Sequence, residues 1–271
     1  MKKLPKIKIH PLLLPLCLLY ILQGQCMIFL GIVFFVTLHE LAHCITAVFF
    51  GAKVNRIWFT PIGERAVIKG LENLSFLKRQ IVFCCGPIVS FLLGIFFIVL
   101  GEGETILFFG SFNILLCCFN LLPFLPLDGG NIILHWVGKK YGILNTAGVL
   151  VKVSRGFGYF LILAGILQVI LYPFNISLLV IGCYIVYSNK KEYLQITYQT
   201  YRALMREQRH MKLVQQVYTK RDVTLGELVG AMSFDTYFWY CSMIEGKVEW
   251  KSQKEVMELL LKKGAGGSVW G

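Results

Sequence analysis

Few residues of this chain are charged, and no two of its cysteines form a CxxC pair. Charged side chains make up 15% of the 271 residues, whereas 56% of the residues are apolar. A soluble domain of this length does not need so much apolar sequence for its core, so the composition favours a polytopic membrane protein. Most of the nine cysteines lie within apolar runs. We therefore expect reduced thiols packed among apolar side chains rather than disulfides or metal ligands.

Lys and Arg are also missing from three short loops, "QGQ", "GEGE" and "YPF". These loops separate apolar segments that are each near the ~20 residues a helix needs to cross a membrane. The six segments are residues 11–24, 26–50, 80–100, 105–127, 155–172 and 174–189. The basic residues behind the net charge of +12 lie in the remaining loops, which places both termini in the cytoplasm and argues against a nucleic-acid partner. The N-terminus lacks a small-x-small cleavage site, so we expect it to remain as the first span.

Further stretches have the composition of structure outside the bilayer. Residues 51–79 alternate short apolar runs with turn residues, which predicts a β hairpin or a re-entrant element at the cytoplasmic face. Residues 191–210 are polar and mildly basic, as expected for a linker helix that leaves the membrane surface. Residues 211–264 have the pattern of a small soluble α+β module, and the Gly-rich residues 265–271 predict a mobile tail.

The most informative polar residues form the sequence HELAH, which lies inside an apolar run. On a helix, His39 and His43 are four residues apart and share one face, while Glu40 occupies the adjacent angular position. Two imidazoles beside a carboxylate are typical of a catalytic zinc site, in which the carboxylate acts as general base and acid. An unpaired Glu within a membrane span is costly, so the motif indicates function more strongly here than on a soluble helix.

A catalytic zinc ion needs a third protein ligand, and Asp128 is the strongest candidate. It follows the helix-breaking residues Pro123 and Pro126 and precedes two glycines. Broken helix at membrane depth is tolerated where it lines a cavity or packs on protein, so this segment can turn Asp128 toward the ion. The residues alone also allow Asp128 to cap the following helix. Asn120 is compatible with two roles, a contact with the substrate or an interhelical hydrogen bond.

Together these motifs resemble those of the site-2 intramembrane metalloproteases. The HExxH motif of that family corresponds to HELAH, and its NxxPxPxxDG motif corresponds to "NLLPFLPLDGG". A Gly-Pro pair in the third span corresponds to Gly86 and Pro87, whereas Ser90 stands where the family often has Asn. "KIKIHPLLLP", "AVFFGAKVNRIWFTPIG" and the C-terminal module are similar to the sporulation branch of the family, which cleaves a membrane-associated sigma-factor precursor.

The resemblance implies an all-α polytopic membrane protein with six transmembrane helices, a short cytoplasmic-face β element and a C-terminal α+β module. It implies a metalloprotease domain at residues 1–190, with Glu40 as the catalytic residue and one zinc ion per chain. The implied metal ligands are His39, His43 and Asp128, and the implied substrate-binding residues are Asn120, Pro123 and Pro126. Residues 211–264 are similar to a cystathionine-β-synthase-type (CBS) module, which implies ATP as a cofactor. A single such module usually needs a partner module, which predicts a homo-oligomer.

The sequence therefore predicts a zinc endopeptidase that cuts a membrane-associated protein precursor near the cytoplasmic side of a cell membrane. The resemblance implies the membrane around the forespore of a sporulating bacterium, and it implies inhibitory membrane proteins and the lipid bilayer as further partners. A membrane zinc transporter or sensor is the alternative. Transport favours ligands that follow one another along a pore, and the spans carry no further ladder of His or Asp residues.

Overall fold

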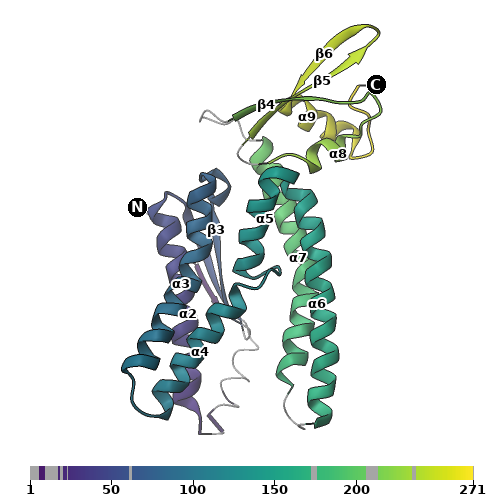
Figure 1. Cartoon of the computed structure of the whole chain (residues 1–271). Coiled ribbons are helices and arrows are strands. Elements are labelled where there is room, and N and C mark those ends of the chain that lie inside the picture. The colour runs from purple at the N-terminus through teal and green to yellow at the C-terminus, as the bar shows by residue number, and fades with distance from the viewer. Residues whose placement is uncertain are drawn as a thin grey trace. The chain divides into compact units, whose positions relative to one another are not determined.

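The computed structural model describes residues 6–9, 18, 21–22, 24–60, 63–171, 176–205, 213–233 and 236–270. The chain divides into two compact units (Figure 1). The first contains residues 1–123 and 127–132, and the second contains residues 124–126 and 133–271. Most of the predicted first span, residues 11–24, lies outside the described residues.

Three apolar helices dominate the first unit. They are α2 (Cys26–Phe49), α3 (Phe76–Leu100) and α4 (Glu104–Asn120). α2 and α3 are long and apolar enough to cross a membrane, and many of their large apolar side chains are exposed, as expected for helices that face lipid. α3 and α4 approach closely at Gly94, where a β-carbon would lie 2.6 Å from Ile114 Cδ1. Small residues at such positions let the backbones of membrane helices pack together.

The predicted fourth span, residues 105–127, is helical only as far as Asn120. Residues 121–127 form turns and bends, and α5 (Asp128–Tyr141) begins directly after them. Pro123 and Pro126 explain this break, because proline lacks the N–H for an intrahelical bond and its ring clashes with the preceding turn. The break makes Asp128 the first residue of a new helix.

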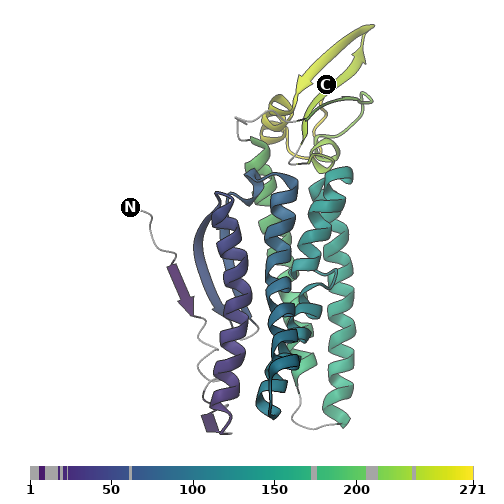
Figure 2. The same ribbon diagram turned by 60° about the vertical axis from the view of Figure 1, so that its left-hand side comes forward.

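A three-stranded sheet completes the first unit. Its strands are β1 (Lys6–Ile9), β2 (Lys53–Thr60) and β3 (Gly63–Lys69), in the order β1-β2-β3, and the short 3-10 helix η1 (Leu71–Asn73) follows them. β2 and β3 pair antiparallel, so the hairpin predicted within residues 51–79 is confirmed. β1 adds to β2 in parallel, a pairing that the sequence pattern did not predict. Figure 2 shows the β2–β3 pair running along α2.

Two long helices, α6 (Ile143–Leu171) and α7 (Ser177–Met205), pack along one another in the second unit. They approach closely, because a β-carbon at Gly182 would lie 2.8 Å from the backbone nitrogen of Ile162. α6 is the third helix of the described chain that is long and apolar enough to span a membrane, so the count of six spans remains a prediction. α7 runs without interruption through residue 191, where the sequence predicted a separate linker helix.

The second unit ends in a small α+β module. Its elements are β4 (Leu213–Tyr218), α8 (Leu225–Gly230), β5 (Thr236–Ile244), β6 (Lys247–Ser252) and α9 (Gln253–Lys263). The strand order is β4-β5-β6, with β4 parallel and β6 antiparallel to β5. α8 and α9 each begin with a capping box, which satisfies backbone N–H groups of the first turn. Leu144 of α6 and Leu204 of α7 belong to the buried core of this module, so the two helices form part of it.

Residues 265–270 are packed in the module, which corrects the prediction of a mobile tail. Val269 is fully buried and Trp270 is 6% exposed, and both belong to the module core. Trp270 Nε1 donates a hydrogen bond to Thr219 Oγ1 at 3.0 Å. The glycines of the tail predicted high chain entropy, but the burial of one large indole offsets that entropy.

Candidate metal centre

Two histidines of α2 point into the first unit. His39 and His43 are each 5% exposed, although α2 exposes large apolar side chains elsewhere along its length. Their spacing of four residues places both rings on one face of the helix, with ring centroids 5.0 Å apart. Glu40, which follows His39, is half-buried. α2 thus carries two imidazoles and a carboxylate at neighbouring angular positions.

The third predicted ligand comes from the break between α4 and α5. The side chain of Asp128 is 17% exposed. The turn before it is tight, because a β-carbon at Gly129 would lie 2.6 Å from the carbonyl oxygen of Leu122. Glycine fits at this position without a shift of the neighbouring backbone. The proline-rich break and the glycine together set the direction in which Asp128 leaves the chain.

The three side chains converge on one point. Asp128 Oδ2 lies 3.1 Å from the Nε2 atoms of both His39 and His43, and the two Nε2 atoms are 3.3 Å apart. Donor atoms ~2.0–2.1 Å from a tetrahedral zinc ion lie roughly 3.3 Å from one another, so these spacings fit one face of such a tetrahedron. Within the part of the chain that the structure describes, no other trio of His, Cys, Asp or Glu side chains meets in this way.

The remaining nitrogen of each ring is bound to the protein. His43 Nδ1 donates to the carbonyl oxygen of Val82 at 2.7 Å, and His39 Nδ1 lies 2.9 Å from Ser90 Oγ. A carbonyl oxygen only accepts hydrogen bonds, so neutral His43 keeps its proton on Nδ1 and turns the lone pair of Nε2 toward the centre. Such second partners are typical of histidines that bind metal. Two imidazole nitrogens and one carboxylate oxygen form a donor set that suits zinc.

α3 packs closely against both rings. A β-carbon at Gly86 would lie 2.8 Å from His39 Nε2 and 2.6 Å from His43 Cε1. Ser90, one turn further along α3, is 1% exposed and reaches His39. The sequence identified Gly86 and Ser90 only through the family resemblance and left the role of Ser90 open. Their contacts depend on how α2 and α3 pack, which no local pattern reveals.

The predicted substrate-binding residues make other contacts. Asn120 Nδ2 donates to the carbonyl oxygen of Leu116, one turn back in α4, at 2.9 Å. This intrahelical bond is neither of the two roles that the sequence suggested for Asn120. Pro123 is exposed and Pro126 is half-buried. Both shape the break before Asp128, and their contact with a substrate remains a prediction.

The chain is similar to known proteins in sequence and in fold. Residues 27–105, which include HELAH, match the family model of peptidase family M50. The chain also resembles the solved structure of the site-2 protease from Methanocaldococcus jannaschii, with a TM-score of 0.58 and 25% sequence identity over 71% of this chain and 94% of that one. Residues 27–105 are thus similar to peptidase family M50, and the fold of the chain is similar to that of a site-2 protease.

Curated proteins with similar sequences carry related names. A zinc metalloprotease of Methanocaldococcus jannaschii is 27% identical over 221 residues, which cover 79% of this chain and 62% of that protein. Stage IV sporulation protein FB of Bacillus subtilis is 28% identical over 205 residues, which cover 74% of this chain and 70% of that protein. The chain therefore spans less than two thirds of the length of the archaeal relative.

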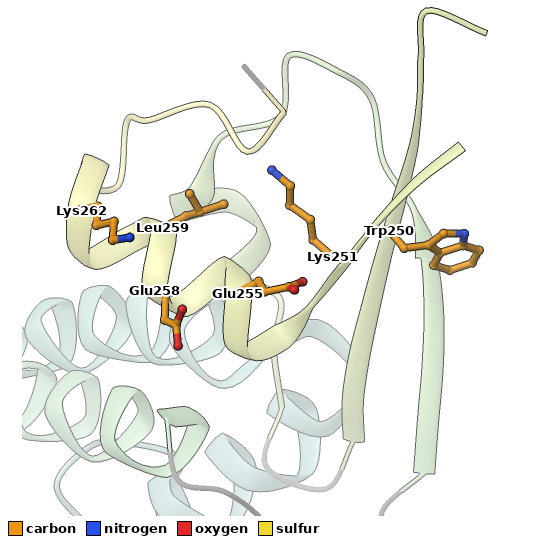
Figure 3. A pocket seen from close by; sticks show the side chains of 6 residues that line it. All are labelled: Trp250, Lys251, Glu255, Glu258, Leu259 and Lys262. Atoms are coloured by element: carbon orange, nitrogen blue, oxygen red, sulfur yellow. The ribbon is translucent and has the colours of Figure 1, made fainter. Parts of the chain in front are cut away.

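A separate hollow of about 280 Å³ lies in the C-terminal module, between β6 and α9 (Figure 3). It is lined by Trp250, Lys251, Glu255, Glu258, Leu259 and Lys262. The two lysines and two glutamates balance in charge, so the hollow has no net attraction for a triphosphate. Lys251 Nζ also donates to the carbonyl oxygen of Val269, and Glu255 caps α9. ATP binding at the module remains a prediction that this hollow does not support.

Proposed function

We propose that this protein is an intramembrane zinc metalloprotease that hydrolyses a peptide bond of a membrane-associated protein near the cytoplasmic side of the membrane. The observation that carries the proposal is the convergence of three donor atoms, 3.1 to 3.3 Å apart, from two elements that are distant in sequence. The outward hydrogen bonds of both histidine rings add support, because they leave the Nε2 atoms for a metal ion.

In this mechanism one zinc ion would be held by His39 Nε2, His43 Nε2 and Asp128 Oδ2, the three atoms that converge. Zinc, when bound, makes water a nucleophile at neutral pH and polarises the scissile carbonyl group. Glu40 takes a proton from the attacking water on a carboxylate oxygen and delivers it to the nitrogen of the leaving amine. The Val82 carbonyl and the Ser90 hydroxyl hold the two rings in place through both proton transfers.

The sheet of the first unit offers a place for an extended substrate. A peptide bond within a helix is sterically closed to attack, and pairing with a sheet edge would hold it open. β1 already occupies one edge of β2, which leaves β3 as the second edge strand of the described sheet. We assign substrate pairing to β3, which also contacts α2, the helix that carries HELAH.

The proposal extends to topology and substrate. Six spans with cytoplasmic termini are supported by the apolar helices and by the exposed Lys190 and Lys191 in the middle of α7, where the chain would leave the bilayer. The substrate we propose is a membrane-associated sigma-factor precursor, the class expected for the sporulation branch. The 28% sequence identity to stage IV sporulation protein FB supports this choice. We propose the location around a forespore and the inhibitory membrane proteins from the same resemblance. We propose a homo-oligomer because a single CBS-like module usually needs a partner module.

Cleavage by the reconstituted full-length chain tests the proposal. The purified protein, placed in vesicles with a membrane-tethered precursor, is expected to cut the precursor when zinc is present. Glu40→Gln should abolish cleavage while zinc stays bound, whereas Glu104→Gln, at an exposed carboxylate at the start of α4, should cut like the unaltered chain. Full activity of the Glu40→Gln variant would show that Glu40 is not the general base. Zinc flux across the vesicle without cleavage would favour the transporter alternative.

A further inference from the structure

A hydroxyl of α6 anchors the segment that leads to Asp128. The backbone N–H of Leu125 donates to Ser154 Oγ at 2.8 Å, and Ser154 Oγ in turn donates to the carbonyl oxygen of Leu150 at 2.7 Å. Leu125 and Ser154 are both fully buried. One hydroxyl therefore accepts one hydrogen bond and donates another where no solvent reaches it.

Leu125 needs this partner because it lies in the break between α4 and α5. Its N–H has no place in a helical ladder, and a buried backbone N–H without an acceptor is costly. The side chain of Leu125 is fixed as well, since it packs in a buried cluster with Ala147 and Leu150 of α6. Both the backbone and the side chain of Leu125 are thus held by the same helix.

We propose that Ser154 is a positioning residue for Asp128. Leu125 lies three residues before Asp128, and Pro126, with its fixed φ, is one of the two residues between them. On the other side of Asp128, Gly129 packs against the preceding turn without room for a β-carbon. Asp128 is therefore confined between a hydrogen-bonded anchor and a close backbone contact. The inference rests on the proposed zinc role of Asp128, but Ser154 itself contacts neither metal nor substrate.

A matched control lies on the same helix. Thr146 is also buried, and its hydroxyl donates to the carbonyl oxygen of Gly142 at 2.8 Å, the same bond to the fourth preceding residue that Ser154 makes. Thr146→Val removes a buried hydroxyl of α6 whose hydrogen bond goes to Gly142 and not to the segment that carries Asp128. A general effect of losing such a bond would therefore appear in both variants, whereas a positioning effect appears only at Ser154.

The zinc affinity of the purified full-length protein, measured by competition with a chelator, tests the proposal without an activity assay. Loss of a residue that orients a metal ligand typically weakens metal binding ~10- to 100-fold, and we expect about tenfold for Ser154→Ala. Ser154→Cys, which keeps the shape but accepts a hydrogen bond weakly, should show a loss in the same direction. Ser154→Thr should restore the affinity, and Thr146→Val should leave it unchanged.

A double-mutant cycle separates positioning from a structural role. If Ser154 acts through Asp128, Ser154→Ala should cause no further loss of zinc affinity in a chain that already carries Asp128→Asn. An equal loss in both backgrounds would overturn the inference, as would unchanged affinity in both Ser154→Ala and Ser154→Cys. Failure of the unaltered chain to bind zinc would instead overturn the proposed function.

Discussion

Replacing Gly86 with alanine should disturb both histidine rings of the proposed zinc site at once. The added β-carbon would overlap the His43 ring and lie 2.8 Å from His39 Nε2. Neither ring can retreat freely, because each Nδ1 atom is bound to a group on α3, the Val82 carbonyl or the Ser90 hydroxyl. The rings or the backbone of α3 must therefore move.

The expected size of this effect follows from the overlap. Overpacking a buried site by a methyl group costs about 1–3 kcal/mol. If the histidine rings move to relieve this strain, the same free energy is lost from zinc binding, which corresponds to roughly a 5- to 140-fold loss of zinc affinity. Gly148→Ala on α6 is the matched control, since a β-carbon there meets no atom within 4 Å. The same substitution should stabilise that helix by up to ~1 kcal/mol, because alanine is the better helix former.

Chelator competition for zinc and thermal unfolding in detergent measure both variants. We expect Gly86→Ala to bind zinc more weakly and Gly148→Ala to bind it as the unaltered chain does, with equal or higher thermal stability. Unchanged zinc affinity of Gly86→Ala would refute the close packing of α3 against the histidine pair.

Three further predictions concern other parts of the chain. Ser90→Ala should weaken zinc binding about tenfold by freeing the His39 ring, and equal affinity would show that the bond does not orient the ring. Trp270→Ala should destabilise the C-terminal module by about 3–5 kcal/mol, seen as faster amide exchange in β5, while Trp250→Ala, at 47% exposure, should change exchange little. Burial raises the pKa of Tyr240, so the folded module retains a proton that the unfolded chain releases near pH ~10. The stability of the module should therefore fall as pH rises above that value. If the stability of the Tyr240→Phe module falls by the same amount, a group other than Tyr240 causes the loss.

Local sequence patterns predicted the three candidate ligands that converge in the structure, because the feature that marks each ligand is local. The spacing of His39 and His43 fixes their common helix face, and the prolines before Asp128 fix the break that carries it. The partners of the rings could not be predicted in this way. Val82 and Ser90 reach the histidines only because α2 and α3 pack closely, and that packing is a long-range property.

Composition was a weaker guide at the two ends of the chain. The basic N-terminus contains β1, whose pairing with β2 joins segments far apart in sequence. The Gly-rich C-terminus was expected to be mobile, yet it supplies acceptors for the start of α8, where Leu225 N donates to the Gly267 carbonyl oxygen at 3.0 Å. Glycine content predicts the conformational entropy of an isolated segment. In the folded module, the burial of Trp270 holds the segment in one conformation.

X-ray absorption at the zinc edge of the purified full-length chain, loaded with one zinc ion, tests the metal centre most directly. The ligand set of His39, His43 and Asp128 predicts nitrogen and oxygen ligands at ~2.0–2.1 Å and no sulfur, with the scattering of two imidazole rings. His43→Ala should remove the signal of one ring. A sulfur ligand at ~2.3 Å, or an unchanged spectrum after His43→Ala, would contradict this assignment.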